Sequence, residues 1–446
     1  MMTAAEAAKA MSGTANGEAS FSEVCIDNRM VTPGCLFFAI KGANFDGHDF
    51  VADAFEKGAA AAVCSRDVDA SGTVIRVEDT RRALIDLAAY NRSKYRIPVV
   101  GLTGSVGKTT TKDMIAYVLA QRYRTLATEG NFNNDIGLPR MCLRLDASIE
   151  AAVFEMGMSG FGEISTLTKI ARPTVGLITN IGVSHIEKLG SREGILKAKM
   201  EILDGMEEDA KLVLNGDNDM LRTVMRKYPR RVVTYGIESD DVDFRATDIK
   251  QEDGRITFTL SGAKKSWKIE IPVIGMHNVY NACAAFICGA LAGVPASSAI
   301  EGLKNYVPDK NRQDIEDRDG ITLINDCYNA SPDSIKASVS VLRDLYCEGR
   351  RIAVLGDMFE LGDYAKQGHL MSGDVVAQSG VDVLYALGPN AKYYIEGAAG
   401  RLETHYFEDR NELVKALRSD IKKGDAVLFK ASRGMKLEEI VKKVFD

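Results

Sequence analysis

The stretch IPVVGLTGSVGKTTTKDMI, residues 97–115, decides the fold of the middle of the chain. Residues 97–102 form an apolar run that predicts a buried strand, and residues 112–123 carry apolar side chains at helical spacing. The loop TGSVGKTT, residues 103–110, therefore joins a strand to a helix, which is the context in which such a glycine loop binds phosphate. The stretch predicts a nucleotide site in an α/β unit.

The residues of this loop divide the chemistry of phosphate binding. Gly104 and Gly107 let the backbone N–H groups turn toward an anion at the helix N-terminus. Lys108 is expected to reach the terminal phosphates, and the Thr109 hydroxyl to hold Mg²⁺. The common G-x-x-x-x-G-K-T spacing would place another glycine where this chain has Leu102, and an ordinary glycine turn is the alternative. Nucleotide contacts are expected from Thr103, Gly104, Ser105, Val106, Gly107, Lys108, Thr109 and Thr110.

The composition is that of an ordinary globular protein of 446 residues, long enough for two to four domains. It is 46% hydrophobic and 26% charged, with a net charge of −6 and no basic stripe that would indicate nucleic acid. No apolar run approaches the roughly 18–20 residues of a membrane span, and the N-terminus lacks the features of a signal peptide. The eight cysteines are scattered without a C-x-x-C pair, so we expect reduced thiols and a cytoplasmic location.

The alternation of strands and helices divides the chain into three α/β domains. Residues 1–96 form a small domain of short segments. Residues 97–308 predict a mostly parallel sheet whose strands, as near-continuous apolar runs, are covered on both faces. Residues 309–446 again alternate strand and helix in a doubly wound, Rossmann-like pattern.

Local signals add detail to this division. In the first domain we expect a strand over residues 35–40 and a helix over residues 50–62. In the central domain, strict alternation begins near residue 243, with turn signals at Asp253-Gly254 and Ser261-Gly262. These signals predict a small antiparallel sheet inserted into the central domain.

Polar side chains follow several of the predicted strands. Glu155 ends a buried strand, where ligands of α/β folds bind and where a carboxylate requires a cation, with an arginine as the alternative partner. His185 follows the next strand, although a hydrogen-bonding histidine is the commoner case. Lys199 lies on a helix, where a solvated charge is the ordinary interpretation. Asn278 and Asn281 open a later helix, three residues apart and on one face.

Together these stretches resemble the Mur ligase family, whose members are ATP-dependent amide ligases of peptidoglycan precursor synthesis. The loop TGSVGKTT is similar to that family's own phosphate loop, which also lacks the first glycine. The roles that the resemblance implies are ATP phosphate binding for Lys108, binding of two Mg²⁺ ions by Thr109, Glu155, His185 and a carbamylated Lys199, and nucleotide contact for Asn278 and Asn281. Catalytic residues would be Lys108, Glu155, His185 and Lys199.

The resemblance covers nearly the whole chain and is closest to the branch that adds D-alanyl-D-alanine to UDP-N-acetylmuramoyl-tripeptide. Its motifs here are NFNNDIGLP (131–139), FEMGM (154–158), NDCYNASPDS (325–334), LGDMFELG (355–362) and KASRGMKLEE (430–439). Residues 27–50 resemble the branch's UDP-sugar-binding domain. The resemblance implies ATP contacts for Arg312 and Asp326, and substrate contacts for Arg29, Asn133, Asn134, Tyr328, Asn329, Lys430 and Arg433.

The implied reaction explains why a phosphate loop is needed. A carboxylate oxygen is a poor leaving group, so transfer of the ATP γ-phosphoryl group first makes an acyl phosphate, which the amine of D-alanyl-D-alanine then attacks. Catalysis of phosphoryl transfer is mostly positioning and charge neutralisation. We expect a monomer that uses ATP, Mg²⁺ and these two substrates, without a nucleic-acid partner or a membrane span.

Several alternatives compete with this interpretation. The sibling ligase that adds diaminopimelate or lysine carries a D-N-P-R motif, which this sequence lacks. Folylpolyglutamate synthetase lacks a UDP-sugar domain, and a GTPase switch would need an N-K-x-D motif that is absent here. A non-catalytic, ligase-like protein would be expected to have lost Lys199, Glu155 or His185, and all three are present.

Overall fold

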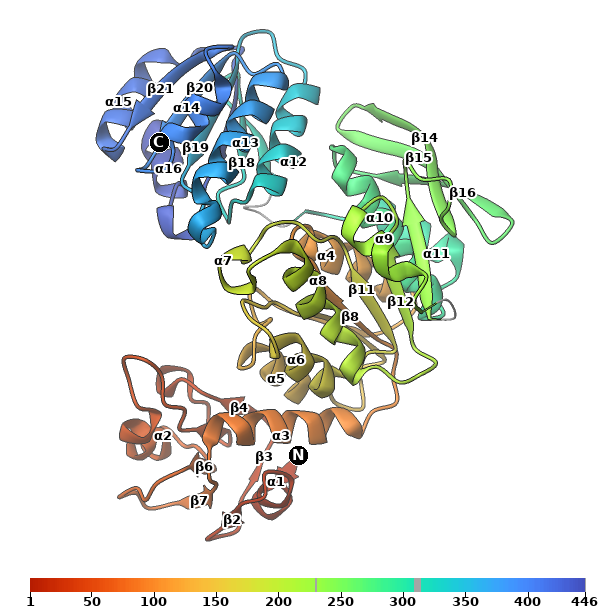
Figure 1. The fold of residues 1–446 in the computed structure, drawn as a ribbon. Coiled ribbons are helices and arrows are strands. Elements are labelled where there is room, and N and C mark those ends of the chain that lie inside the picture. The colour runs from red at the N-terminus through yellow and green to blue at the C-terminus, as the bar shows by residue number, and fades with distance from the viewer. Residues whose placement is uncertain (229–230, 309–313, 446) are drawn as a thin grey trace.

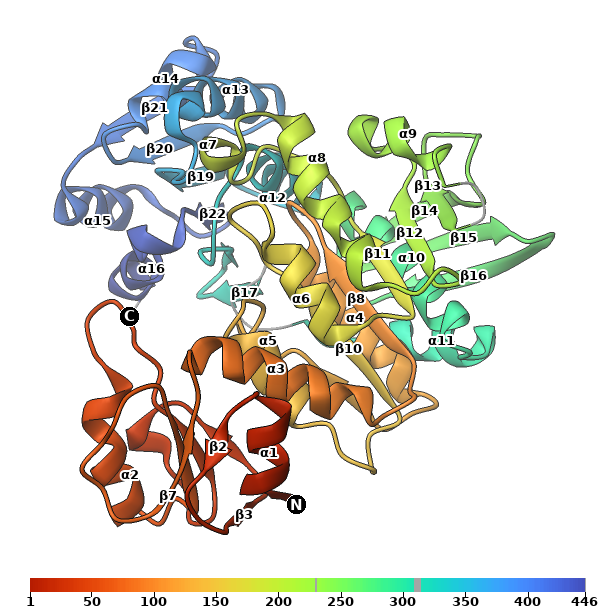
Figure 2. The same cartoon turned by 60° about the horizontal axis from the view of Figure 1, so that its bottom comes forward.

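The structure is a computed structural model that describes residues 1–228, 231–308 and 314–445. Figures 1 and 2 show the larger sheets with helices packed on their faces, and in Figure 1 the nine-stranded central sheet lies between the five-stranded and six-stranded sheets. The predicted α/β class with mostly parallel sheets is confirmed. Within the described ranges no helix has both the length and the apolar character needed to cross a membrane.

The N-terminal unit, red in Figure 1, is built on a five-stranded sheet in the order β2-β7-β6-β5-β4, in which only the β2–β7 pair is antiparallel. Its strands are β2 (Thr14–Ala15), β4 (Val24–Cys25), β5 (Leu36–Phe38), β6 (Ala61–Cys64) and β7 (Thr73–Arg76), with a separate pair of β1 (Met2–Thr3) and β3 (Ser20–Phe21). Its helices are α1 (Ala4–Ala10), α2 (Val51–Glu56) and α3 (Thr80–Ser93).

The central unit has a nine-stranded sheet in the order β16-β15-β14-β13-β12-β11-β8-β10-β9. Its strands are β8 (Val99–Thr103), β9 (Thr125–Ala127), β10 (Ala151–Glu155), β11 (Val175–Ile178), β12 (Lys211–Asn215), β13 (Val232–Gly236), β14 (Phe244–Glu252), β15 (Arg255–Gly262) and β16 (Lys265–Ile271). Its helices are α4 (Lys108–Ala120), α5 (Gly137–Leu143), α6 (Glu163–Ala171), α7 (Ile186–Leu189), α8 (Arg192–Met200), α9 (Asp219–Met225), α10 (Met276–Leu291) and α11 (Ala296–Lys304).

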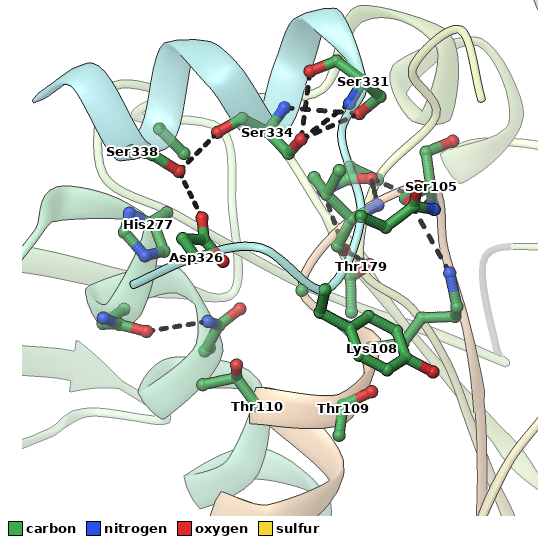
Figure 3. Close-up of a pocket in the computed structure, with 18 of the residues that line it drawn as sticks. Ser105, Lys108, Thr109, Thr110, Thr179, His277, Asp326, Ser331, Ser334 and Ser338 are labelled. Atoms are coloured by element: carbon green, nitrogen blue, oxygen red, sulfur yellow. Dashed lines mark hydrogen bonds between the residues drawn. The ribbon is translucent and has the colours of Figure 1, made fainter. Parts of the chain in front are cut away.

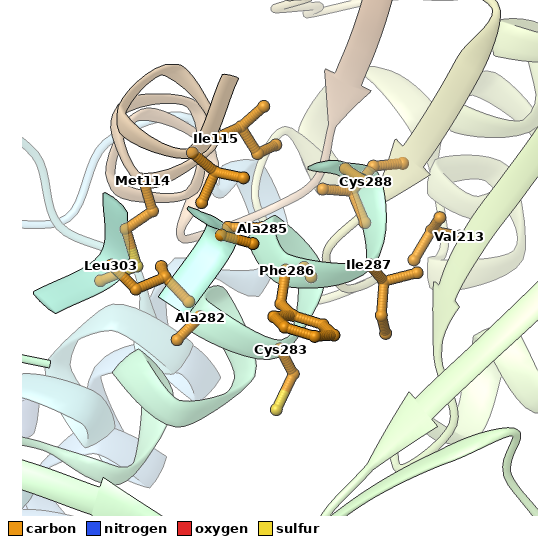
Figure 4. Close-up of a cluster of buried hydrophobic side chains, with 14 of the residues drawn as sticks. Met114, Ile115, Val213, Ala282, Cys283, Ala285, Phe286, Ile287, Cys288 and Leu303 are labelled. Atoms are coloured by element: carbon orange, nitrogen blue, oxygen red, sulfur yellow. The ribbon is translucent and has the colours of Figure 1, made fainter. Parts of the chain in front are cut away.

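Two helical layers cover the central sheet, and this explains the continuous apolar strands. Every residue of β8 is buried, as expected of a strand covered on both faces. On one face α10 packs against α4, with Phe286 and Met114 in the cluster that Figure 4 shows. On the other face the core includes Leu138 of α5 and Leu167 of α6.

The C-terminal unit, blue in Figure 1, has a six-stranded sheet in the order β17-β18-β22-β19-β20-β21, antiparallel only at the β17 edge. Its strands are β17 (Asp314–Arg318), β18 (Ile321–Asn325), β19 (Arg351–Gly356), β20 (Val383–Leu387), β21 (Glu403–Phe407) and β22 (Ala426–Lys430). Its helices are α12 (Pro332–Asp344), α13 (Ala365–Gln378), α14 (Lys392–Ala398), α15 (Arg410–Asp420) and α16 (Glu438–Phe445).

Two local predictions were wrong, on the end of a helix and on the position of a turn, and a third was confirmed. The helix expected over residues 50–62 ends at Glu56, because Gly58 has a φ of +94° and breaks it before β6 begins. The predicted antiparallel insertion is confirmed, because β14 pairs antiparallel with β15 and β15 with β16. These strands extend the central sheet, since β14 also pairs in parallel with β13. The turn expected at Ser261-Gly262 lies two residues later, where Ala263 and Lys264 have φ values of +50° and +62°.

All eight cysteines are free; seven are buried and Cys347 is partly buried. Their side chains pack as small hydrophobic groups, as in the cluster of Figure 4 that contains Cys283 and Cys288.

Helix α3 is the joint between the N-terminal and central units. Two of its polar side chains, Asn91 and Arg92, are buried. The Asn91 amide donates to the carbonyl oxygens of Cys142 and Leu145, both at 3.0 Å. The Arg92 guanidinium donates to the carbonyl oxygen of Ala171 at 2.8 Å. These bonds give buried carbonyl oxygens at and just beyond the ends of α5 and α6 a side-chain donor from α3.

We predict that Arg92→Ala destabilises this joint by roughly 1–3 kcal/mol, because buried carbonyl oxygens lose their donor. Scanning calorimetry should detect a lower transition temperature. Arg82→Ala is the matched control on the same helix: its partner is Asp86, one turn away on the surface, and the change should stay within about 0.5 kcal/mol. Equal transition temperatures for the two variants would contradict the claim that the hydrogen bonds of Arg92 stabilise the contact between α3 and the central unit.

Candidate active site

A cavity of about 980 Å³ lies between the central and C-terminal units. It is bounded by the loop after β8 on one side and by the segments after β18 on the other (Figure 3). The carboxyl ends of parallel strands from two sheets therefore open into one space, which is where α/β proteins bind ligands. The predicted residues that line it are Ser105, Val106, Gly107, Lys108, Thr109, Thr110, Asn133, Asn134, Glu155, His185, Asn278, Asn281, Asp326, Tyr328, Asn329 and Lys430.

Both glycines of the phosphate loop lie so close to neighbouring side chains that a Cβ atom would not fit. Gly107, the N-cap of α4, has a φ of +81°, and a Cβ there would lie 3.0 Å from Asn281 Oδ1. A Cβ on Gly104 would lie 1.9 Å from Thr179 Oγ1. The loop is therefore folded tightly between the end of β11 and helix α10.

Asn180 holds the phosphate loop through two of its N–H groups. Asn180 Oδ1 accepts hydrogen bonds from the N–H groups of Ser105 at 3.1 Å and Val106 at 3.0 Å. The N-cap of α4, Gly107, has no side chain that could cap the first turn, so a bound phosphate can take the place of a cap there. Lys108 Nζ donates to the Gly104 carbonyl at 2.8 Å, folded over its own loop. The arrangement is an anion site at a helix N-terminus.

Glu155 is a buried carboxylate at the end of β10, 3% exposed. Its oxygens accept hydrogen bonds from Thr109 Oγ1 and from Asn133 Nδ2, both at 2.8 Å, and its backbone N–H donates to Thr128 Oγ1. None of the ion pairs found in the described ranges reaches it. Neutral donors orient the carboxylate but do not balance its charge, so the position suits a bound cation.

Lys199 lies near the end of α8 and is 2% exposed. Its side chain has no hydrogen bond or ion pair among the described residues. Burial, and then the positive charge of Lys108, hold the pKa of Lys199 well below its usual range. The following Glu201 accepts hydrogen bonds from the N–H groups of Gly162 and Ser165, which fixes α8 against the start of α6.

His185 follows β11 and begins α7 with a φ of +64°. Its Nδ1 lies 2.8 Å from Glu360 Oε2, an ion pair that crosses from the central to the C-terminal unit. The hydrogen bond with His185 lowers the pKa of Glu360.

Asn278 and Asn281 lie on one face of α10, as predicted, and are joined to each other. Asn281 Nδ2 donates to Asn278 Oδ1 at 3.0 Å, and Asn278 Nδ2 donates to the Ile274 carbonyl at 2.8 Å. Asn281 Oδ1 also accepts a hydrogen bond from Thr111 Oγ1 at 3.0 Å. The helix is thereby fixed to the base of the phosphate loop.

The C-terminal unit contributes a buried ion pair to the opposite wall. Asp326, after β18, lies 2.5 Å from Lys430 Nζ at the end of β22. Ser338 Oγ of α12 donates to the same Asp326 oxygen (Figure 3). A carboxylate, an ammonium group and a hydroxyl thus face the phosphate loop across the cavity.

Five predicted residues lie away from the cavity lining. Thr103 and Gly104 are buried at the base of the loop, and Lys199 lies beside it. Arg29 is exposed in the N-terminal unit and pairs with Asp27 at 2.6 Å. Arg433 pairs with Glu438 at 3.0 Å and lies over the Tyr328 ring. Arg312 falls outside the described residues.

Four side chains that the structure places at the site have no role in the sequence analysis. They are Asn180, Asp333, Ser338 and Glu360. Asp333 and Glu360 belong to motifs noted in the sequence, and Asn180 lies just after the strand that precedes His185, so a position after a strand was the available signal for Asn180. Their hydrogen-bond partners depend on tertiary packing.

The donors present fit magnesium. Within the described ranges, no group of three or more His, Cys, Asp and Glu side chains could hold a metal ion. Thr109 and Glu155 nevertheless offer a hydroxyl and a carboxylate beside an anion site. Mg²⁺ is usually held in this way, by one or two protein oxygens together with substrate phosphates and water.

Comparison with known proteins gives consistent matches. Three family models match: the Mur ligase middle domain over residues 102–289, the Mur ligase glutamate ligase domain over residues 311–433, and the Mur ligase family catalytic domain over residues 20–92. A UDP-N-acetylmuramoyl-tripeptide–D-alanyl-D-alanine ligase from Bacillus subtilis (strain 168) is 42% identical over 431 residues, 95% of this chain and 93% of the relative.

Solved structures agree with these matches. A crystal structure of MurF from Acinetobacter baumannii has a TM-score of 0.92 at 32% identity and covers 100% of this chain and 98% of its own. A MurF ligase from Thermotoga maritima in complex with ADP has a TM-score of 0.84 at 30% identity and covers 95% and 96%.

We predict that Asn180→Ala weakens binding of Mg²⁺-ADP by about 5- to 30-fold, equivalent to about 1–2 kcal/mol, because the Val106 N–H loses its acceptor and the Ser105 N–H keeps only the Asn180 carbonyl oxygen. Isothermal titration calorimetry measures the change. Asn305→Ala removes an exposed amide whose partner is Glu301 on α11, and should bind as the parent does. Unchanged affinity for Mg²⁺-ADP in Asn180→Ala would show that Asn180 is not needed to hold the loop for nucleotide binding.

Proposed function

The chain belongs to the Mur ligase family, and from that premise we propose that it joins D-alanyl-D-alanine to UDP-N-acetylmuramoyl-tripeptide with hydrolysis of ATP. The product would be the pentapeptide precursor of peptidoglycan, with ADP and phosphate. The observation that carries the proposal is the single cavity in which the phosphate loop and Glu155 face Asp326 and Lys430 from another sheet.

The phosphate loop performs the first half of the proposed reaction. The tripeptide carboxylate attacks the γ-phosphorus of ATP, the bond to the β,γ-bridging oxygen breaks, and ADP leaves. Lys108 leaves the Gly104 carbonyl to contact the phosphates, while the first-turn N–H groups of α4 hold them. Both groups neutralise charge that is already in place, which is the main requirement of phosphoryl transfer.

Magnesium binding is assigned to the donors that fit it. Thr109 and Glu155 would hold one ion, and His185 a second. Bound Mg²⁺ would supply Lewis-acid neutralisation of the phosphate charge. Asn133 keeps the Glu155 carboxylate turned toward Thr109, because its amide binds the other carboxylate oxygen.

Carbamylation of Lys199 is part of the same proposal. An unprotonated amine can attack CO₂, form an N–C bond and release one proton, which leaves a carbamate anion. Burial and the charge of Lys108 favour the unprotonated amine. The product would be a buried anion near the phosphate loop, suited to Mg²⁺.

The two substrates are assigned to different units of the proposed division at residues 96 and 308. The UDP-sugar would contact Arg29. This side chain now donates hydrogen bonds to Asp27, and they lower the pKa of Asp27 to about 2. The dipeptide would contact Tyr328 and Asn329, which line the cavity from the C-terminal unit, with Lys430 beside them. A monomer in the cytoplasm is the assembly and location that we propose.

We predict that Lys199→Ala is nearly inactive and that short-chain carboxylic acids restore part of its activity, because they replace the carbamate oxygens. A carbamate signal from ¹³C-bicarbonate in the NMR spectrum of the parent protein is the direct measurement. Lys197→Ala, on the exposed face of the same helix above the Phe161 ring, should retain activity and the signal. Full parent activity without bicarbonate would exclude the modification.

We predict that D-alanyl-D-alanine exceeds D-alanine by orders of magnitude in kcat/KM, because the shorter acceptor leaves several site groups unpaired at roughly 1–3 kcal/mol each. Phosphate release with UDP-N-acetylmuramoyl-tripeptide as donor measures both acceptors. A preference for diaminopimelate or lysine, with the corresponding dipeptide donor, would instead assign the chain to the sibling ligase.

A further inference from the structure

One ion pair crosses from the C-terminal unit to a predicted metal ligand. His185 Nδ1 lies 2.8 Å from Glu360 Oε2. Glu360 lies in the segment between β19 and α13, whereas His185 lies between β11 and α7. The contact therefore brings the loop after a strand of one sheet to the loop after a strand of the other.

Because His185 contacts Glu360 through Nδ1, the protonation of Nδ1 determines whether Nε2 can bind a metal ion. With Nδ1–H donating to the Glu360 carboxylate, the neutral imidazole has a lone pair on Nε2. Carboxylates that bind one histidine nitrogen commonly fix the ring and its tautomer so that the other nitrogen binds a metal. His185 lines the cavity, so its Nε2 is the nitrogen left for a ligand there.

Backbone conformation supports a functional role for the pair. His185 has a φ of +64° and Glu360 a φ of +62°, both in the left-handed region that side chains other than glycine rarely adopt. Such residues gather at binding sites and switch regions, where the surrounding structure holds them. Exposed ion pairs contribute little to stability, and the Glu360 side chain is 60% exposed, so stability alone does not account for the pair.

A second carboxylate of the C-terminal unit contacts the same short segment. Asp333 Oδ2, at the start of α12, accepts a hydrogen bond from the Val183 N–H at 3.2 Å. The approach requires a glycine, since a Cβ on Gly182 would lie 1.9 Å from that oxygen. Residues 182–185 are thus held from the C-terminal unit at two points.

We propose that Glu360 is a positioning residue for metal binding: it orients His185 when the C-terminal unit docks, and so couples the affinity for a divalent cation to docking. This inference rests on the proposed function, which assigns His185 to metal. Asp333 sets the distance between the two loops, and Glu360 then fixes the ring. The cation site beside His185 is complete only with the C-terminal unit in place.

The test measures Mn²⁺ binding to the full chain with saturating ADP, by electron paramagnetic resonance of free Mn²⁺. Glu360→Ala should weaken the affinity about tenfold or more, as loss of a carboxylate behind a metal-binding histidine does. Glu360→Gln keeps an acceptor for Nδ1–H and should recover most of the loss. Glu403→Ala is the matched control, because it breaks another Glu–His pair of 2.8 Å, with His405, in the same unit.

A double-variant cycle separates this inference from the proposed function. His185→Ala should weaken Mn²⁺ binding, and adding Glu360→Ala should weaken it no further, because Glu360 acts through the ring. If His185→Ala binds Mn²⁺ as the parent does, the metal role of His185 fails. If His185→Ala is weaker but Glu360→Ala is unchanged, only the role of Glu360 fails.

Docking gives a second readout beside affinity. With saturating ADP, added Mn²⁺ should lower the radius of gyration of the parent and of Glu403→Ala in small-angle scattering, and should lower that of Glu360→Ala less. Tighter Mn²⁺ binding by Glu360→Ala would overturn the proposal, since Glu360 would then compete with the metal for His185. An equal response of Glu360→Ala and the parent to Mn²⁺ would overturn the coupling to docking.

Discussion

Buried charge without a full counter-charge is the constraint on which this site depends. Glu155 is turned toward the cavity by Thr109 and Asn133, both neutral donors. Lys199 is buried without a hydrogen-bond or ion-pair partner among the described residues, and burial and the charge of Lys108 lower its pKa toward the neutral amine. A buried carboxylate without a cation opposes folding, and a bound metal ion would balance the charge of Glu155. A nucleotide and its metal, if they bind only the folded chain, therefore stabilise the fold as well as the reaction.

Sheet topology determines which side chains can meet. The parallel strands β8, β10 and β11 end at one edge of the central sheet, and β18 and β22 end at one edge of the C-terminal sheet. Because these edges face the same cavity, short loops suffice to bring distant parts of the chain together. The loops themselves are held by hydrogen bonds from neighbouring segments, as Asn180 holds the phosphate loop.

Most of the fold could be predicted because hydrophobic runs such as residues 97–102 and 151–156 are covered on both faces. Tertiary pairing is what the sequence did not predict: the alternation of β14 indicates an antiparallel strand but does not reveal that β13 is its other neighbour. Site residues that follow strands were found by position. Asn180 and Glu360 received no role, because a sequence does not say which backbone group or histidine a side chain will face. The roles of Arg29 in UDP-sugar binding and of Lys199 in metal binding stay predictions, because neither side chain lines the cavity.

The buried sulfur atoms have a consequence for chemical reactivity. Burial raises the pKa of Cys64 to about 11 and of Cys142 to about 12, and it raises the pKa values of Cys283 and Cys288 still further above the usual range. Thiolates are the nucleophilic form, so these positions are inert toward electrophiles while the fold is intact. The buried thiols thus present little reactive sulfur, and a single thiol introduced on the surface could carry a fluorescent reporter once the partly exposed Cys347 is replaced.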